Sequence, residues 1–213
     1  MAKRNSKWLI GFGVGFLFWV GACAHTATET APDETPPQSS QVYFPVTVGS
    51  SWTYKISPAP AESNIETVSI VENLPGNRFK DSRGDIFQMR TSGVHDGNRY
   101  LMKMPLAVGH HWMAVRSATV VERYKILAKD LTIAVPAGIF NHCMKIQGEV
   151  DIRPGPNQPS AQMKMEWIYA PYVGIIQLTQ YVQPQGASEP KRTAQFQLLK
   201  YSIADPATLV TQP

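Results

Sequence analysis

Two pairs of neighbouring residues have the types that metal binding or nucleophilic catalysis requires. His110 and His111 stand side by side in the stretch PLAVGHHW, and His142 precedes Cys143 in IFNHCMKI. Both stretches have the apolar character of β-strands, and adjacent residues of a strand point to opposite faces of a sheet. The two histidines are therefore poorly placed to share a metal ion, and the His–Cys pair is poorly placed for proton transfer. We expect Cys143 to be a small buried hydrophobe.

The other candidates for acid–base chemistry also have simpler explanations. His95 is followed by Asp96 in HDGNR, a turn signal in which an aspartate typically bonds to the backbone. The carboxylates Glu149, Asp151 and Glu166 alternate with lysines and an arginine, as on a solvated face of a sheet. The chain contains no GxSxG, CxxC or HExxH motif and no phosphate-binding glycine loop. We therefore expect no catalytic residue, no metal and no cofactor, and predict that the protein is not an enzyme.

A set of large apolar residues at alternating positions offers a different kind of site. They are Met144, Met163, Met165, Trp167, Tyr169 and Phe196. On a curved sheet they would share the concave face, where methionine suits both irregular core packing and an adaptable apolar pocket. A closed core is the commoner use of such residues, and a pocket for a lipid or acyl chain is the functional alternative.

The elements that would hold these residues are short strands. In MKIQGEVDIR, AQMKMEWIYA and TAQFQLLKY, apolar and polar residues alternate, which sends one set to each face of a sheet. Turn signals such as LPGNR, HDGNR, VPAG and PQGASEP separate the runs, and no stretch has convincing helical periodicity. The sequence predicts an all-β fold with an antiparallel, strongly curved sheet or half-open barrel. A β-sandwich is the alternative, and few or no helices are expected after the first 22 residues.

One pattern occurs twice, 60 residues apart, as PVTVGSSW at 45–52 and PLAVGHHW at 105–112. In each copy a glycine, Gly49 or Gly109, can take a positive φ. Three residues later a tryptophan, Trp52 or Trp112, can fold back under the turn and bury a large apolar area. Because the first copy has serines where the second has histidines, we interpret the pattern as a turn used twice and not as a repeated ligand site.

The N-terminus has the layout of a secretory signal peptide. Three basic residues precede the uncharged run WLIGFGVGFLFWVGA, which ends in small residues and Cys23. The tetrad Val20-Gly21-Ala22-Cys23 resembles the lipobox of bacterial lipoproteins. The resemblance implies cleavage before Cys23, diacylation of its sulfur and an acyl chain on the new N-terminus, so that the lipid binds the protein to a membrane. A plain signal peptide and an uncleaved membrane anchor are the alternatives.

The residue after the cysteine is Ala24, whereas inner-membrane lipoproteins of Gram-negative bacteria tend to have Asp there. The resemblance therefore implies a lipid-anchored protein of the cell envelope, on the outer membrane facing the periplasm if the organism is Gram-negative. Removal of residues 1–22 takes away three of the 20 basic residues and leaves 17 against 16 acidic ones. A nearly neutral, exported chain without a basic run is not expected to bind nucleic acid.

Composition divides the chain into four parts. Residues 1–22 form the signal peptide, 23–41 a lipidated disordered tether, 42–205 a single β domain and 206–213 a C-terminal tail. Residues 24–41 contain no large aliphatic or aromatic side chain, so they cannot bury enough apolar surface to fold. As a coil they would hold the domain on the order of 25 Å from the bilayer.

Three phrases carry a family resemblance: YFPVTVGSSWTY, VPAGIFNHCMKI and YAPYVGII. Together they resemble TapB-like bacterial envelope proteins and related domains of unknown function, over most of residues 43–178 and in the same order. The resemblance implies an exported, β-rich domain and supplies no catalytic residues. We expect an envelope lipoprotein with a non-catalytic binding or interaction role and an envelope protein as partner. A carrier of a lipid or acyl-chain ligand is the alternative, and a hydrolase is less favoured.

Overall fold

The computed structural model describes residues 39–58, 64–97, 99–117, 120–152 and 160–205. The predicted signal peptide, Cys23, most of the predicted tether and the C-terminal tail 206–213 lie outside these residues. Among the described residues, no helix has the length and apolar character needed to span a bilayer.

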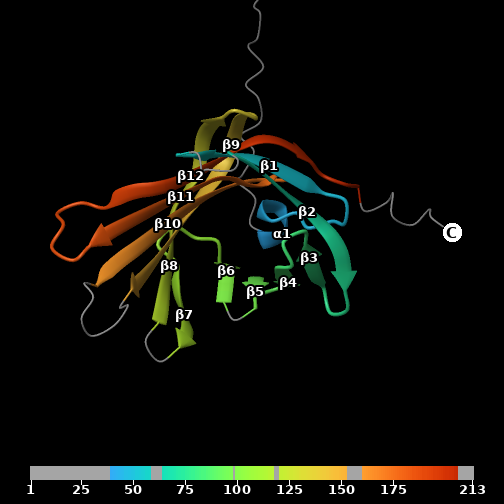
Figure 1. Ribbon diagram of the computed structural model, residues 1–213. Helices are drawn as coiled ribbons and strands as arrows, with labels where there is room; N and C mark the ends of the chain where they lie inside the picture. The colour runs from blue at the N-terminus through green and yellow to red at the C-terminus, as the bar shows by residue number, and fades with distance from the viewer. Residues whose placement is uncertain (1–38, 59–63, 98, 118–119, 153–159, 206–213) are drawn as a thin grey trace, which may run out of the picture. The chain divides into compact units, whose positions relative to one another are not determined.

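The described residues form one short helix and twelve strands (Figure 1). In chain order these are α1 (Ser40–Tyr43), β1 (Ser51–Ser57), β2 (Ile65–Leu74), β3 (Arg78–Asp81), β4 (Ile86–Arg90), β5 (Gly93–Asp96), β6 (Arg99–Lys103), β7 (His111–Ser117), β8 (Val120–Val135), β9 (Gly138–Ile152), β10 (Ala161–Ala170), β11 (Gly174–Pro184) and β12 (Lys191–Ser202). The helix begins at Ser40, so the last two residues of the predicted tether, 40 and 41, are helical.

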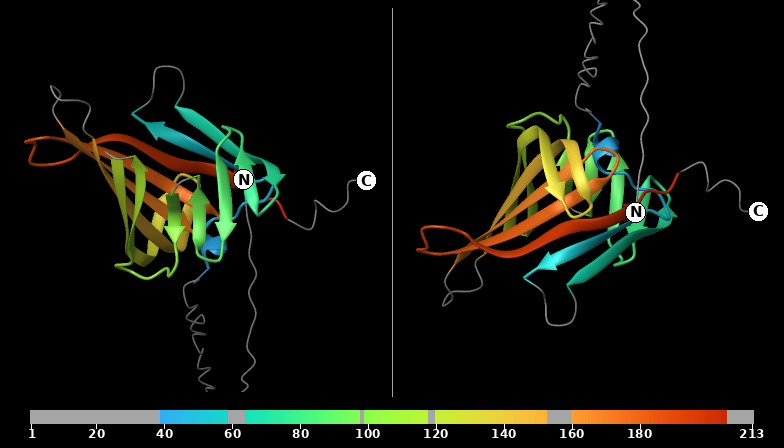
Figure 2. Two further views of the ribbon diagram at one scale, coloured as in Figure 1. Left: turned by 90° about the horizontal axis from the view of Figure 1, so that it is seen from below. Right: turned by 90° about the horizontal axis from the view of Figure 1, so that it is seen from above.

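All twelve strands belong to a single antiparallel sheet in the order β6-β5-β4-β3-β2-β1-β12-β11-β10-β9-β8-β7. The sheet curves until its two edge strands, β6 and β7, approach one another, which makes a nearly closed barrel (Figures 1 and 2). Trp112 on β7 donates its indole N–H to the carbonyl oxygen of Tyr100 on β6 at 3.0 Å across this seam. The prediction of an all-β, antiparallel, strongly curved sheet is confirmed, and the sandwich alternative is wrong because one continuous sheet encloses the core.

The alternation in β9 places one set of side chains in the core. Met144, Ile146 and Val150 are buried, whereas Lys145, Gln147 and Glu149 are only half-buried. On the opposite face, Arg123 pairs with Asp151 at 3.1 Å, as expected for the charged side of the sheet. β9 therefore has one face toward the core and one toward solvent, as is common in antiparallel sheets.

At one end of the sheet both faces are covered, which strand alternation did not predict. Trp167, Ile168, Tyr169 and Ala170 are all buried, although successive residues of β10 point to opposite faces. The cause is the long β8–β9 hairpin, whose tip lies over the neighbouring strands (Figure 2). The backbone N–H of Ala137 at this tip donates to the carbonyl oxygen of Leu198 on β12 at 2.9 Å. A second apolar cluster forms there, with Cys143, Ile168, Ala170, Ile176 and Val135 among its members.

The repeated sequence pattern makes the same turn twice, as predicted. Gly49 and Gly109 have φ values of 93° and 87°. The backbone N–H of Gly49 donates to Ile70 O at 2.9 Å, and that of Gly109 donates to Ile126 O at 2.9 Å. The residue after each glycine closes the turn with a bond to the residue three positions before it, at 2.9 and 3.0 Å. Each turn therefore starts a strand, β1 or β7, and bonds it to the next one along the chain.

Candidate functional site

A cavity of about 390 Å³ lies between the two arms of the curved sheet. One arm contributes β1 to β6 with the β3–β4 turn, and the other arm contributes β10, β11 and β12. The segment after α1 completes the wall. Small-molecule sites of proteins typically measure about 300–1,000 Å³. The cavity therefore has the size of a ligand site.

Most of the cavity wall is apolar and much of it is aromatic. The apolar and aromatic lining residues are Phe44, Pro45, Val46, Trp52, Tyr54, Val68, Ile70, Phe87, Leu101, Met165, Trp167, Ile175, Leu178 and Phe196. Two of them are fixed by hydrogen bonds to β11 and to the loop before it. The indole N–H of Trp52 donates to the carbonyl oxygen of Val173, and the Tyr54 hydroxyl donates to Ile175 O at 2.9 Å. These rings are held in place, so the wall is preformed.

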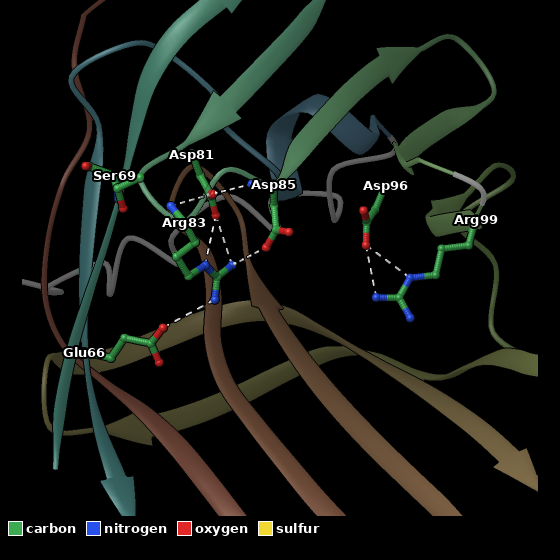
Figure 3. Close-up of polar contacts among 8 residues, drawn as sticks. Glu66, Ser69, Asp81, Arg83, Asp85, Asp96 and Arg99 are labelled. Atoms are coloured by element: carbon green, nitrogen blue, oxygen red, sulfur yellow. Dashed lines mark hydrogen bonds and ion pairs between the residues drawn. The ribbon is translucent and has the colours of Figure 1, made fainter. Parts of the chain in front are cut away.

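The polar part of the wall contains a first arginine, Arg83, in the β3–β4 turn (Figure 3). Its Nε donates to Asp81 Oδ2 at 3.1 Å, and its Nη2 lies 3.0 Å from the same oxygen. Nη2 also lies 3.4 Å from Asp85, and Nη1 lies 3.5 Å from Glu66 on β2. Each guanidinium nitrogen therefore faces a carboxylate.

Asp81 positions this turn. Its side chain is fully buried, and Oδ1 accepts hydrogen bonds from the backbone N–H groups of Arg83 and Asp85, both at 2.9 Å. Ser82 then ties the turn to β2, because its hydroxyl accepts from the backbone N–H of Ser69 at 3.2 Å. The buried carboxylate thus both shapes the turn and neutralises the arginine that the turn presents.

The second arginine, Arg99, begins β6. Its Nε and Nη2 donate to Asp96 Oδ2 at 3.2 and 3.0 Å. Its Nη1 donates to both oxygens of Glu122 at 3.2 Å and to the Tyr124 hydroxyl at 3.3 Å. That hydroxyl donates in turn to Glu122 Oε2 at 2.6 Å. Arg99 therefore joins the edge strand β6 to β8 across the seam of the barrel.

These contacts shift the pKa values of both arginines in the same direction. Burial alone would lower the pKa of the Arg83 guanidinium, but the charges of Asp81, Asp85 and Glu66, with the hydrogen bond to Asp81, raise it overall. Burial also opposes the charge of Arg99, yet its interactions with Tyr124, Glu122 and Asp96 raise its pKa. Both guanidinium groups stay charged at every physiological pH.

The structure brings half of the predicted apolar lining residues to this cavity. Met165, Trp167 and Phe196 line it. Met144 and Tyr169 are fully buried in the core next to it, and Met163 lies further along β10, partly exposed and away from the cavity. The use of Met165, Trp167 and Phe196 as ligand contacts stays a prediction.

The histidine pairs of the sequence do not converge on the cavity. His95 packs against the Tyr100 ring with 3.7 Å between ring centroids, and burial, with the charges of Arg90 and Lys103, lowers its pKa. His110 is half-buried and His111 is exposed, as expected for neighbours on opposite faces. Among the described residues, no group of His, Cys, Asp or Glu side chains could hold a metal ion.

The second pair, His142 and Cys143, does not line the cavity either. Cys143 is fully buried, and burial raises the pKa of its thiol to about 11. His142 has a positive φ of 55° at an irregular point of β9, and its Nδ1 contacts the carboxylate of Asp130. The thiol and the imidazole therefore have different surroundings, and Cys143 is the small buried hydrophobe that the sequence predicted.

The polar wall was missed by sequence analysis. Arg83 and Asp85 belong to the stretch DSRGD, which has the composition of a hairpin turn and gave no reason to expect a site. Asp96 was noticed only as a turn residue beside His95. The one available signal was the density of opposite charges in a turn of five residues, and only the curvature of the sheet shows that this turn faces apolar strands.

No family model matches the chain, and no curated protein matches its sequence. Two solved structures are similar to it. One is described as a candidate exported protein with a YmcC-like fold from Bacteroides fragilis, with 15% identity over 76% of this chain and 99% of that one and a TM-score of 0.43. The other is a candidate lipoprotein from Parabacteroides distasonis, with 15% identity over 78% of this chain and 100% of that one and a TM-score of 0.41. The lipobox and the resemblance to TapB-like proteins stay predictions.

Proposed function

We propose that the protein is a lipid-anchored binding module of the bacterial cell envelope, and that its cavity binds an amphiphile with an apolar body. The observation that carries this proposal is the cavity of about 390 Å³ between the arms of the sheet. A barrel that served only as a scaffold would fill its interior with side chains. Here Met165, Phe196 and Trp167 stand beside open space.

The composition of the wall favours binding over catalysis. No serine, threonine, cysteine, histidine or lysine is among the described residues that line the cavity. The polar lining groups are mainly carboxylates and guanidinium groups already bonded to one another, which suits orientation of a ligand. An aromatic and methionine-containing wall adapts to flexible apolar chains. A hydrolase is therefore the less supported alternative.

The proposed anchor is Cys23, acylated after removal of residues 1–22, on the outer membrane facing the periplasm if the organism is Gram-negative. Support comes from the agreement of the basic N-terminus, the apolar run and the Val20–Cys23 tetrad. Intact-mass measurement of the protein isolated from membranes should show a diacylglyceryl group on Cys23, and the Cys23→Ser variant should lack it. A mass equal to that of the full translated chain would contradict cleavage and acylation.

Ligand binding is tested with the mature chain, residues 23–213, carrying Cys23→Ser so that its own lipid does not compete. Native mass spectrometry should detect a co-purifying amphiphile, and a fluorescent alkyl probe should bind with one site per chain. Val68 lines the cavity on β2, so Val68→Trp should fill the space and weaken probe binding at least tenfold.

Val71 provides the matched control. It lies three residues along the same strand, is 50% exposed and does not line the cavity. Val71→Trp should bind the probe as the parent chain does. Equal probe affinity in a folded Val68→Trp variant would remove the cavity as the site.

A second candidate function is docking of an envelope protein on the outer face of β7. Met113 and Val115 point outward there and are 69% and 68% exposed. Exposed apolar residues close together on one strand favour an interaction surface. A photo-crosslinker at position 113 should capture a discrete partner in cells, and one at exposed Val71 should not. Crosslinking of many unrelated proteins from both positions, 113 and 71, would count against docking.

A further inference from the structure

We infer that the polar end of the bound amphiphile is cationic, an amine or quaternary ammonium group, and not a carboxylate or phosphate. This inference rests on the proposed function, because it names the class of ligand for the same cavity. The cavity wall contains four carboxylates, Glu66, Asp81, Asp85 and Asp96, against the two guanidinium groups. Its formal charge is therefore −2, and Glu122 behind Arg99 adds a further negative charge.

The two arginines, which at first sight suit an anionic head group, are already paired with carboxylates of the chain itself. All three nitrogens of Arg83 face carboxylate oxygens (Figure 3). All three nitrogens of Arg99 donate to Asp96, Glu122 or Tyr124. An incoming carboxylate would meet guanidinium groups whose charge is already neutralised. Its own negative charge would lie close to those of Asp85, Glu66 and Asp96, and like charges repel one another more strongly in such a half-buried place than in bulk water.

The carboxylates of the wall, in contrast, can still accept hydrogen bonds from a cationic ligand. An ionised carboxylate offers about four acceptor positions. The side chains of Asp85, Glu66 and Asp96 are 56%, 33% and 27% exposed, so a ligand ammonium can reach their outer oxygens without breaking the ion pairs. Opposite charges within a few ångströms in such a half-buried place attract more strongly than in bulk water.

The aromatic residues of the wall add to this preference. Trp52, Tyr54, Phe87 and Trp167 line the same cavity as the carboxylates. The negative faces of such rings attract alkylammonium groups, and clusters of aromatic rings are a common way to bind quaternary ammonium ions. The apolar strands of the other arm then accommodate the alkyl chain.

The test compares head groups at one chain length. Four compounds compete with the alkyl probe for the mature Cys23→Ser chain at pH 7.5: decylamine, decyltrimethylammonium, decanol and decanoate. Decanol is kept below its solubility limit, and the ionic compounds are kept below their critical micelle concentrations. The two cations should bind at least tenfold more tightly than decanoate, and the affinity of decanol should lie between that of the cations and that of decanoate. The difference should shrink as the salt concentration rises. Circular dichroism verifies that the chain stays folded with each compound.

Two carboxylates on β2 provide matched variants. Glu66 lines the cavity, whereas Glu72 pairs with Lys80 and does not line it. Glu66→Gln should reduce the preference for decylamine over decanoate by roughly threefold to tenfold, and Glu72→Gln, with the same change in net charge, should leave it unchanged.

The outcomes separate the two proposals. Decanoate binding as tightly as decylamine would overturn the cationic head group and leave the binding function standing. Equal effects of Glu66→Gln and Glu72→Gln would show that net charge, and not the cavity wall, sets the preference, which also overturns the inference. Absence of binding by all four compounds and by the probe would overturn the proposed function itself.

Discussion

Trp52 and Trp112 occupy equivalent positions in two copies of one turn, yet only Trp52 lines the cavity. Both side chains are buried, and both donate the indole N–H to a backbone carbonyl oxygen on another segment, that of Val173 for Trp52 and that of Tyr100 for Trp112. The same turn therefore supports the cavity wall in one copy and the seam of the barrel in the other.

Replacement of each tryptophan by phenylalanine should separate these two roles. Trp52→Phe and Trp112→Phe each leave a carbonyl oxygen without its donor, so each should lower the free energy of unfolding by about 1–3 kcal/mol. Urea denaturation measures this loss. Only Trp52→Phe should also weaken binding of the alkyl probe, and only Trp112→Phe should speed amide exchange in β6. Loss of probe binding in both variants to the same degree would contradict the distinction.

The repeat illustrates what the sequence could predict. The turn is visible in the linear order because its closing bond joins the residue after each glycine to the residue three positions earlier. Strand alternation in β9 is visible because successive residues point to opposite faces. Burial of Ile168 depends on a hairpin tip more than 25 residues away in sequence, and no local pattern encodes it. The polar wall was missed for the same reason, because Arg83 becomes part of a site only when the sheet curves.

Asp81 should be the most sensitive residue of the polar wall. Its buried carboxylate accepts two backbone N–H groups and neutralises Arg83, so Asp81→Ala removes three hydrogen bonds at once. We expect a loss of about 1–3 kcal/mol for each of the two backbone N–H groups that is left without its acceptor. Asp81→Asn keeps an acceptor for the backbone and should lose less. Urea denaturation measures the free energy of unfolding of both variants. Equal stability of Asp81→Ala and Asp81→Asn would show that the turn does not need an oxygen acceptor at this position.

Gly148 provides the space for an aromatic row inside the barrel. The rings of Trp112 and Tyr124 stack at 5.4 Å, and Trp167 continues the row at 6.0 Å from Tyr124. A Cβ at position 148 would lie 2.9 Å from carbon atoms of both Tyr124 and Trp167. Gly148→Ala should therefore cost about 1–3 kcal/mol and change the near-UV circular dichroism spectrum.

The neighbouring variant Gln147→Ala is the control for this prediction. Gln147 points to the opposite face of β9, where its amide donates to Glu149 at 2.6 Å. Its replacement should leave the near-UV spectrum unchanged. An unaltered spectrum in Gly148→Ala as well would show that the aromatic row adjusts without loss of order.

Cys143 should not react with thiol reagents in the folded protein. Its pKa of about 11 leaves about one thiolate in a thousand at pH 8, and the side chain is also inaccessible. In the Cys23→Ser chain, maleimide labelling followed by mass spectrometry should be slow without denaturant and fast in concentrated guanidinium chloride. Rapid labelling of the native chain would indicate that the β8–β9 hairpin tip opens readily.

Glu166 should make the stability of the fold depend on pH. Its carboxylate lies 2.8 Å from Lys145 Nζ and 3.1 Å from Lys164 Nζ, and although burial opposes the charge, the hydrogen bonds and charges of these lysines lower its pKa overall. A pKa lower in the folded than in the unfolded chain contributes stability that is fully present above the unfolded value of about 4.5 and is lost as the pH falls through the folded value. Glu166→Gln should therefore reduce the free energy of unfolding by roughly 1 kcal/mol at pH 7, and this difference from the parent chain should disappear towards pH 3. Glu189→Gln, at an exposed position in the β11–β12 loop, is the control. A difference that stays constant from pH 7 to pH 3 would show that Glu166 acts through packing and not through its charge.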